Sequence, residues 1–203
     1  MTESEYVIRR AHPGDEEKVL ELVREVKAAM PQEQQIWLSI DSLADDLKDL
    51  GNPKIRCWLA LAAGKDTGKG SAETGENPGD AQGAAPEKED AEIAAIFYIV
   101  IPGLSEHNLG CHVGFSDEEL LRTIHMDTAA VRPGHRGHGL QKHLMRHAEE
   151  EMRREGYTHF MGTVHPQNRY SHAAFDDLGY RVVWSGLKYG GKPRDVMEKD
   201  DPA

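Results

Sequence analysis

The stretch VRPGHRGHGLQ, residues 131–141, joins two patterns that together decide the fold. Before it, LLRTIHMDTAAV (120–131) is apolar and β-branched enough to predict a strand. After it, apolar side chains recur at four-residue spacing from about 137 to 155, which predicts a helix. A strand, a glycine-rich turn and a helix in this order place free backbone N–H groups at the positive end of a helix dipole. The stretch therefore predicts an anion-binding turn.

The residues of the turn narrow the choice of anion. Gly137 and Gly139 leave room for a diphosphate against the main chain, and Arg136 adds a positive charge. The glycines of GHRGHG (134–139) lack the offsets of a dinucleotide-binding G-x-G-x-x-G turn, and no GK[ST] follows as in a P-loop. The alternative is a turn that binds nothing and serves only the architecture.

The rest of the chain alternates strand and helix patterns. Further helices are predicted from about Pro13 to Met30, at 41–50 and at 168–178, and residues 103–119 are predicted as a loop. Further strands are predicted at 6–11, 56–63, 91–102, 158–164, 180–189 and 194–199. This order predicts an α/β (α+β) fold with a mixed central sheet flanked by helices.

Length and composition limit the class of protein. The 203 residues suit one domain, 1–203, and the stretch 64–90, which has no large apolar side chain, predicts a disordered insertion between two strands. The net charge of -11 disfavours nucleic acids and anionic membranes as partners. Two distant cysteines predict neither a disulfide nor a zinc site, and the longest apolar run, 93–101, is too short to span a bilayer. We therefore expect a soluble cytoplasmic protein.

Two motifs in the chain resemble those of a known family. The pattern V-x-P-x-x-R-G-x-G is similar to motif A of the GNAT superfamily of N-acetyltransferases, and TVHPQNRYSHAAFDDLGY (163–180) resembles the strand and helix that follow it there. RGHGLQ, TVHPQN and KYGG together resemble a bacterial subgroup of unassigned substrate. The resemblance implies the GNAT acyl-CoA N-acyltransferase fold, acetyl-CoA as cosubstrate, and no metal.

The resemblance also implies which residues contact the coenzyme. They are Ala129, Ala130, Val131, Arg136, Gly137, His138, Gly139, Leu140, Gln141, Asn168, Ser171 and Phe175. Gln141 departs from the glycine or alanine usual in the loop motif, so its side chain must point away from the diphosphate or bind it. A main-chain N–H near Ala130 or Val131 would meet the oxyanion that forms during transfer.

The chemistry of amine acetylation needs a base, because an amine is mostly protonated at neutral pH and cannot attack a thioester in that form. Asp127 and His125 lie two apart on the strand before the turn, so we expect them to share a face and to supply the base. Alternatively, both side chains serve only to hold the end of the strand by hydrogen bonds. Phe175 stands where many relatives carry a tyrosine that protonates the departing thiolate, so Tyr170 or solvent would have to replace it.

The sequence gives fewer indications of which residues bind the acetyl acceptor. Residues 31–40 occupy the place where relatives contact the acceptor, which makes Trp37 the substrate-binding candidate, and Asn108 lies in a loop that could also reach the site. The predicted function is direct transfer of acetyl from acetyl-CoA to a primary amine of a small molecule. The alternatives are acetylation of a protein or peptide, and a non-catalytic module that senses acyl-CoA. His143 and His147 lack a third metal ligand, so no metal site is predicted there, and the resemblance is compatible with a homodimer without fixing the oligomeric state.

Overall fold

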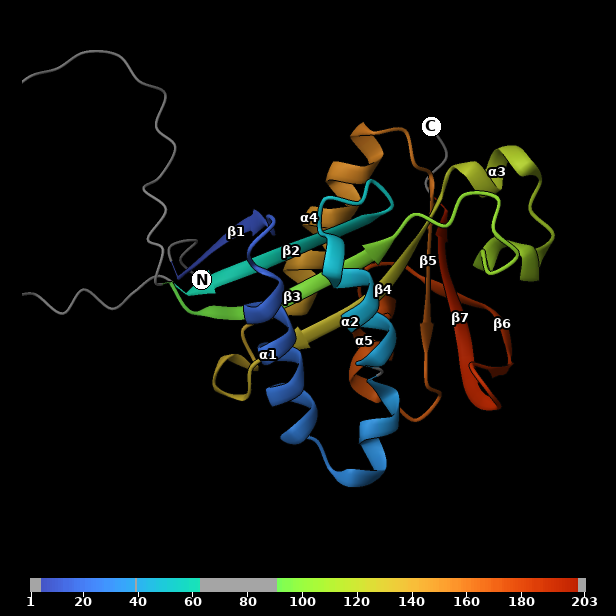
Figure 1. The fold of residues 1–203 in the computed structure, drawn as a ribbon. Coiled ribbons are helices and arrows are strands. Elements are labelled where there is room, and N and C mark those ends of the chain that lie inside the picture. The colour runs from blue at the N-terminus through green and yellow to red at the C-terminus, as the bar shows by residue number, and fades with distance from the viewer. Residues whose placement is uncertain (1–4, 39, 63–90, 201–203) are drawn as a thin grey trace, which may run out of the picture.

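The computed structural model describes residues 5–38, 40–62 and 91–200, so the predicted insertion at 64–90 lies outside the described residues. The chain forms a seven-stranded sheet in the order β1-β2-β3-β4-β5-β7-β6 (Figure 1). The strands are β1 Tyr6–Arg10, β2 Ile55–Ala62, β3 Ile93–Val100, β4 Thr123–Val131, β5 His159–Val164, β6 Arg181–Lys188 and β7 Lys192–Asp200. All neighbouring strands are antiparallel except β4 and β5, so the predicted mixed sheet is confirmed.

Helices cover both faces of the sheet. They are α1 Glu16–Ala28, α2 Asp41–Asp46, α3 Asp117–Leu121, α4 Leu140–Arg154 and α5 Arg169–Asp176. Short 3-10 helices are η1 Gln32–Trp37, η2 Leu47–Asp49, η3 Leu109–Val113 and η4 Pro133–His135. In the part of the chain that is described, no helix is long and apolar enough to cross a membrane.

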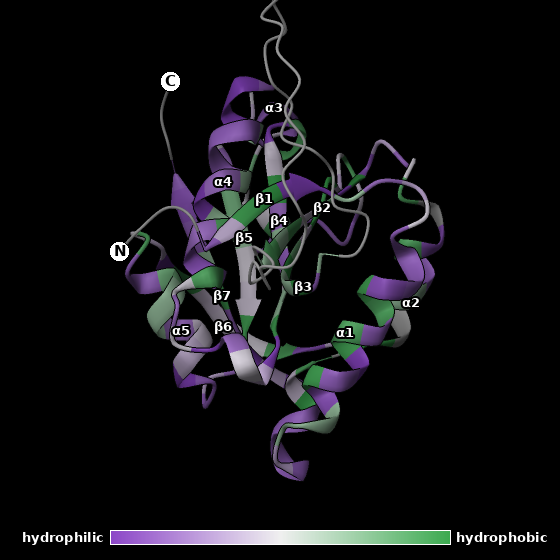
Figure 2. Cartoon of the chain, turned by 90° about the vertical axis from the view of Figure 1, so that its left-hand side faces the viewer, coloured by the Kyte–Doolittle hydropathy of each residue, from purple (hydrophilic) through white to green (hydrophobic). Residues whose placement is uncertain are grey.

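The side chains of strand β3 contribute to two hydrophobic clusters, one on each face of the sheet. Phe97 and Ile99 pack in the cluster that includes the apolar side of α4, whereas Ile96 and Tyr98 pack in the cluster that includes α1. Side chains alternate along a strand, so a run that is apolar at every position buries both faces. The apolar sides of α1 and α2 turn toward the sheet in Figure 2, and their polar sides turn away.

The predicted loop at 103–119 is wrong in part, because it contains η3 and the start of α3. A capping box begins α3, with Ser116 Oγ accepting from the Glu119 N–H and the Glu119 carboxylate accepting from the Ser116 N–H. The strand predicted from residue 120 accordingly begins at Thr123. The side-chain amide of Asn108 donates to the carbonyls of Gly103 and Leu120, at 2.7 and 3.1 Å.

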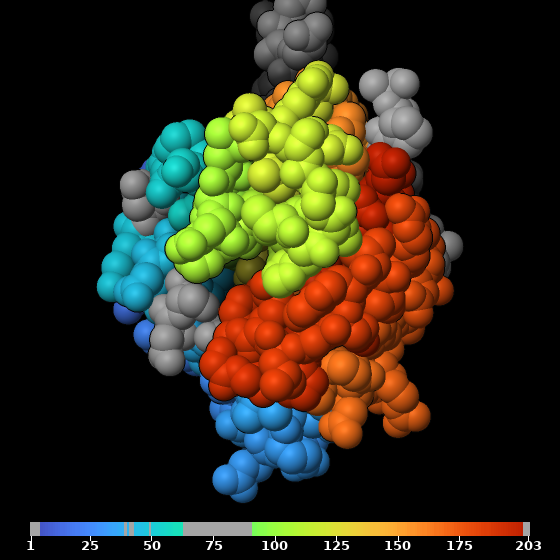
Figure 3. All heavy atoms as spheres, turned by 90° about the vertical axis from the view of Figure 1, so that its right-hand side faces the viewer, coloured from blue at the N-terminus to red at the C-terminus, as the bar shows by residue number. Residues whose placement is uncertain are grey.

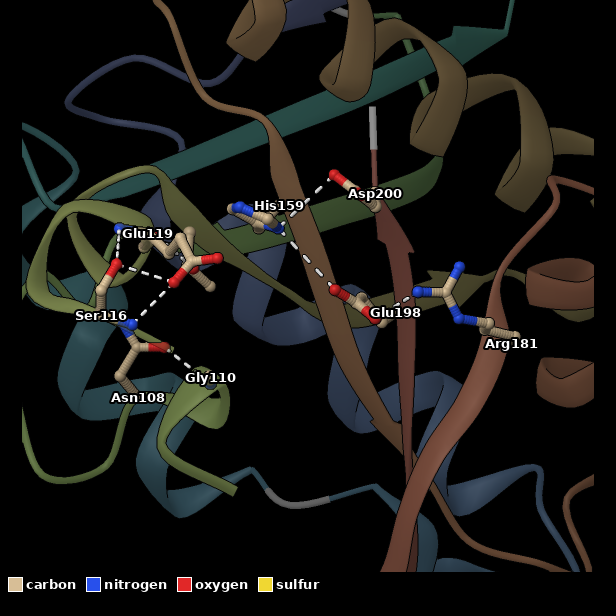
Figure 4. A network of polar contacts seen from close by, with 9 residues as sticks. Asn108, Gly110, Ser116, Glu119, His159, Arg181, Glu198 and Asp200 are labelled. Carbon is tan, nitrogen blue, oxygen red and sulfur yellow. Dashed lines mark hydrogen bonds and ion pairs between the residues drawn. The ribbon is translucent and has the colours of Figure 1, made fainter. Parts of the chain in front are cut away.

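The same segment packs on the C-terminal strands, as Figure 3 shows in the contact of the yellow-green and red parts. Leu109 is buried with Met161 of β5 and Val196 of β7. Figure 4 shows that the Asn108 side chain accepts from the N–H of Gly110 inside this segment, at 3.0 Å. Asn108 is therefore occupied in holding the segment together, and it does not reach the candidate site that the sequence suggested for it.

Candidate functional site

Strand β4 contains an irregularity at Asp127. Thr128 pairs with Tyr98 and Met126 pairs with Ile99, so Asp127 is an extra residue with no partner on β3. This is a β-bulge, which bends a strand and re-aims a side chain. The bulge also interrupts the strict two-residue alternation from which a shared face of His125 and Asp127 was predicted.

The two parallel strands, β4 and β5, part just before the bulge. Their pairing runs from Thr123 opposite His159 to His125 opposite Met161 and goes no further. The C-terminal halves of β4 and β5 therefore leave part of their backbone edges free of sheet hydrogen bonds. These halves form two walls of a cavity of about 910 Å³.

The cavity brings together most of the residues predicted for the site. Those that line it are Trp37, Asp127, Ala129, Val131, Arg136, Gly137, Gly139, Leu140, Gln141, Asn168, Tyr170, Ser171 and Phe175. His125, Ala130 and His138 are not among the lining residues. Ala130 is buried in the cluster beneath α1, and the exposed His138 ring places Nδ1 3.2 Å from the His135 carbonyl oxygen.

The glycine turn has the geometry that an anion site needs. Gly137 and Gly139 adopt φ of +86° and +73°, a region that L side chains rarely enter, and Gly139 is the N-cap of α4. The first helical bond after the cap runs from the His143 N–H to the Gly139 carbonyl, at 3.1 Å. The N–H groups at the start of α4 thus lack helical partners and lie at the positive end of the helix dipole. The helix begins at Leu140, three residues later than predicted, because of these two glycines.

The turn is also tied to the far edge of the sheet. The Tyr6 hydroxyl lies 3.0 Å from His135 Nδ1, which connects β1 to η4. With the glycines, the free N–H groups and the adjoining cavity, the turn fits the diphosphate of a coenzyme A. In the described ranges, no three His, Cys, Asp or Glu side chains lie close enough to hold a metal ion.

Asp127 is the one carboxylate on β4 that faces the cavity. The carboxyl opens onto the cavity, and desolvation by the surrounding cavity wall raises its pKa, with a smaller contribution from the nearby Asp46. The Thr128 hydroxyl donates to Asp127 Oδ1 at 2.7 Å and partly opposes the shift. A carboxylate with a raised pKa is a stronger base than one with the usual pKa.

His125 has a different environment. Its Nε2 accepts a hydrogen bond from the Leu109 N–H at 2.9 Å, which holds η3 against β4. Burial, with a contribution from the positive charge of Lys188, lowers the pKa of His125 to about 4. The lone pair that would have to accept a proton is therefore already engaged, and the ring is neutral at neutral pH.

Phe175, at the position where many relatives carry a tyrosine, and Tyr170, the predicted replacement, differ in exposure. Phe175 is 5 % exposed, and its ring meets Tyr180 edge-on with centroids 4.8 Å apart. Tyr170 lines the cavity from the start of α5 and is 83 % exposed. The phenol of Tyr170 thus lies at the rim of the cavity, where water also reaches.

The cavity also contains residues that the sequence did not single out. His165, at the end of β5, stacks on Trp37 with ring centroids 5.6 Å apart, and Thr163 and Arg194 also line the cavity. Burial and the positive charge of Arg194 lower the pKa of His165, whose Nδ1 accepts from the Gln167 N–H at 3.2 Å. The TVHPQN motif contained a signal for His165, directly after a strand. Arg194 had no local signal, because only strand order brings β7 beside β5.

Comparisons with known proteins agree with this geometry. The sequence model of the acetyltransferase (GNAT) family matches residues 72–180. No curated protein sequence matches the chain. Among solved structures, the ribosomal-protein-S18-alanine N-acetyltransferase of Escherichia coli has a TM-score of 0.60 at 14% identity, over 98% of this chain and 96% of that one.

Two further solved structures are similar to the same extent. YncA of Salmonella typhimurium, determined with acetyl-CoA, has a TM-score of 0.60 at 15% identity, over 98% of this chain and 96% of its own. NAA60 of Arabidopsis thaliana, in complex with a bisubstrate analogue, has a TM-score of 0.60 at 13% identity, over 97% and 99%. At such low identities these structures establish the fold alone.

The fold and the family match define an N-acetyltransferase. The chain belongs to the acetyltransferase (GNAT) family. This assigns an enzyme, which disfavours the alternative of a non-catalytic module that senses acyl-CoA.

Proposed function

We propose that this enzyme transfers acetyl directly from acetyl-CoA to a primary amine of a small molecule, with Asp127 as the base. The observation that carries the proposal is the position of Asp127, the extra residue of a bulge in the cavity that also contains the glycine turn. Bulges next to active sites commonly re-aim a functional side chain.

The glycine turn would hold the diphosphate of acetyl-CoA through the N–H groups around Gly137, Gly139 and Leu140. Arg136 lines the cavity beside them and adds a charge-assisted contact. The cavity between the separated ends of β4 and β5 includes both the turn and Asp127. A thioester bound there could therefore meet an amine beside Asp127. Much of the acceleration would come from this positioning.

Asp127 would accept the proton of the acceptor ammonium, directly or through water. Its raised pKa suits it to this role better than a carboxylate with the usual pKa. His125 was the other candidate, and its bond from the Leu109 N–H supports a positioning role instead.

The departing thiolate needs a proton that Phe175 cannot supply. Tyr170 is the phenol at the cavity rim, and its 83 % exposure means that solvent can supply the proton at the same place. We therefore propose a minor role for Tyr170 in this step.

The test compares Asp127→Asn with Asp117→Asn, which removes an exposed carboxylate outside the cavity. Calorimetry with acetyl-CoA, coenzyme A and NAD precedes a screen of amines and peptides read by thiol release. We expect the first two ligands to bind both variants, and Asp127→Asn to lose about 100-fold or more in kcat. Because Asp127 must be ionised to act, the acidic limb of kcat/KM for wild type lies above the usual carboxyl range.

Three results would contradict the proposal. They are no binding of acetyl-CoA, equal turnover of the two variants, and turnover restricted to peptides. The last would select the peptide alternative, to which the names of the Escherichia coli and Arabidopsis structures give some weight.

A further inference from the structure

Arg194 places a nearly buried positive charge in the cavity. The residue is 7 % exposed, lines the cavity from β7, and forms no ion pair with any carboxylate in the described parts of the chain. Its NH1 donates to the Pro193 carbonyl at 2.8 Å, and its guanidinium lies 5.8 Å from the centre of the Tyr189 ring. These contacts hold the group in place but do not neutralise it, and an unpaired buried charge is costly.

The strand directs this charge away from the coenzyme helices. Asp195, the next residue, lies 3.1 Å from His172 Nε2 on α5, and Val196 packs with Leu109 on the other face. Because side chains alternate along a strand, Arg194 lies on the face opposite α5. That face is the one against which α1, α2 and η3 pack.

Tyr189 connects Arg194 with Thr163 in the cavity wall. In the described residues it is the one non-glycine residue with positive φ, at +50°, a conformation that costs about 1 kcal/mol and is often kept at functional sites. Its hydroxyl lies 3.4 Å from Thr163 Oγ1, which faces the cavity. Tyr189 is 56 % exposed, and its ring lies beside the Arg194 guanidinium. The phenol of Tyr189 thus contacts both Thr163 and the Arg194 guanidinium.

We propose that the acceptor carries an oxyanion, a carboxylate or a phosphate, in addition to its amine, and that Arg194 binds this oxyanion. A guanidinium donates two parallel hydrogen bonds to such a group, which neutralises the buried charge. Asp127 then faces the ammonium end of the same molecule. The inference rests on the proposed function and adds the class of acceptor to it.

The test uses three series of probe amines with chains of equal length. They are ω-amino carboxylates with two to five methylene groups, the matching ω-aminoalkyl phosphates, and the uncharged ω-amino carboxamides. Each series is assayed for acetylation by wild type, Arg194→Gln, Arg194→Lys and Lys192→Gln. Lys192 is on the same strand but does not line the cavity, so its variant controls for loss of a positive charge.

We expect wild type and Lys192→Gln to prefer an anionic series over the carboxamides. Arg194→Gln should lower kcat/KM for that series by about 10- to 100-fold and leave the carboxamides nearly unchanged. Arg194→Lys should keep part of the preference, since it retains the charge without the planar fork. The preferred series distinguishes a carboxylate from a phosphate.

Three outcomes overturn the inference. They are equal use of carboxamides and anionic probes by wild type, an equal loss on all probes in Arg194→Gln, and a weaker affinity of Arg194→Gln for acetyl-CoA. The last would assign Arg194 to the coenzyme.

The failure of the proposed function can be recognised separately. If no probe is acetylated, the transfer proposal fails, and calorimetric binding of the same probes to the coenzyme A-loaded protein decides the inference. Selective binding of an anionic series that Arg194→Gln loses would still support the inference. Equal binding or no binding of the three series would overturn it.

Discussion

The environment of His125 leads to a prediction about stability in acid. The unfolded chain takes up a proton on this residue as the pH falls below about 6.5. The folded protein keeps the ring neutral until the pH approaches its pKa of about 4, because the ring is buried. The stability that neutral His125 contributes is therefore complete above pH 6.5 and is lost as the pH falls from 6.5 to 4.

The size of the effect follows from the difference between the two pKa values. One pKa unit corresponds to about 1.4 kcal/mol, and most of the difference is expressed by pH 4.5. Lowering the pH from 7 to 4.5 should thus cost about 2 kcal/mol of unfolding free energy through His125 alone. The perturbation that isolates this contribution is His125→Gln, whose amide oxygen can still accept from the Leu109 N–H but does not titrate.

The assay is urea unfolding of wild type and His125→Gln at pH 7 and pH 4.5. Acid effects elsewhere in the chain occur in both proteins and cancel in the comparison. We expect the wild type to lose about 2 kcal/mol more than the variant over this range. Parallel loss in the two proteins would refute the assignment of His125 as a buried neutral acceptor. The variant should also keep most of its kcat, in contrast to Asp127→Asn.

Three substitutions test other parts of the site. Gly162→Ala should destabilise the protein by about 1–3 kcal/mol, because the added Cβ would lie 2.6 Å from Phe175 Cζ and 2.8 Å from the Met126 carbonyl oxygen. Gly134→Ala, where nothing lies within 4 Å, is its control in thermal unfolding, and equal effects would argue against the close packing of β4, β5 and α5. Gly139→Asp should weaken acetyl-CoA binding at least 10-fold more than Gly139→Asn in calorimetry, since both tolerate positive φ and only the first repels phosphate. Tyr170→Phe should change kcat by less than about 3-fold if solvent protonates the thiolate, and a loss of about 100-fold would assign the step to Tyr170.

The local patterns of the sequence determined most of the elements and the coenzyme turn. Helix and strand periodicity depends on neighbours a few residues apart, so it can be recognised without the fold. The positive φ at Gly137 and Gly139 is likewise a local requirement. The loop prediction at 103–119 failed because the capping box at Ser116 is a short signal, and η3 depends on packing against β5 and β7.

Tertiary structure decided the acceptor side of the site. The bulge at Asp127 is defined by how β4 pairs with β3, and the separation of β4 from β5 is defined by where their pairing ends. Neither pairing can be read from one strand alone. Arg194 reaches the cavity because β7 inserts between β5 and β6, an order that strand patterns do not encode. The environments of His125 and Asp127 differ for the same reason: His125 accepts a hydrogen bond from the Leu109 N–H, whereas Asp127 faces the cavity. Contacts between distant segments set the environment of each ionisable group, and that environment determines which one can act as a base.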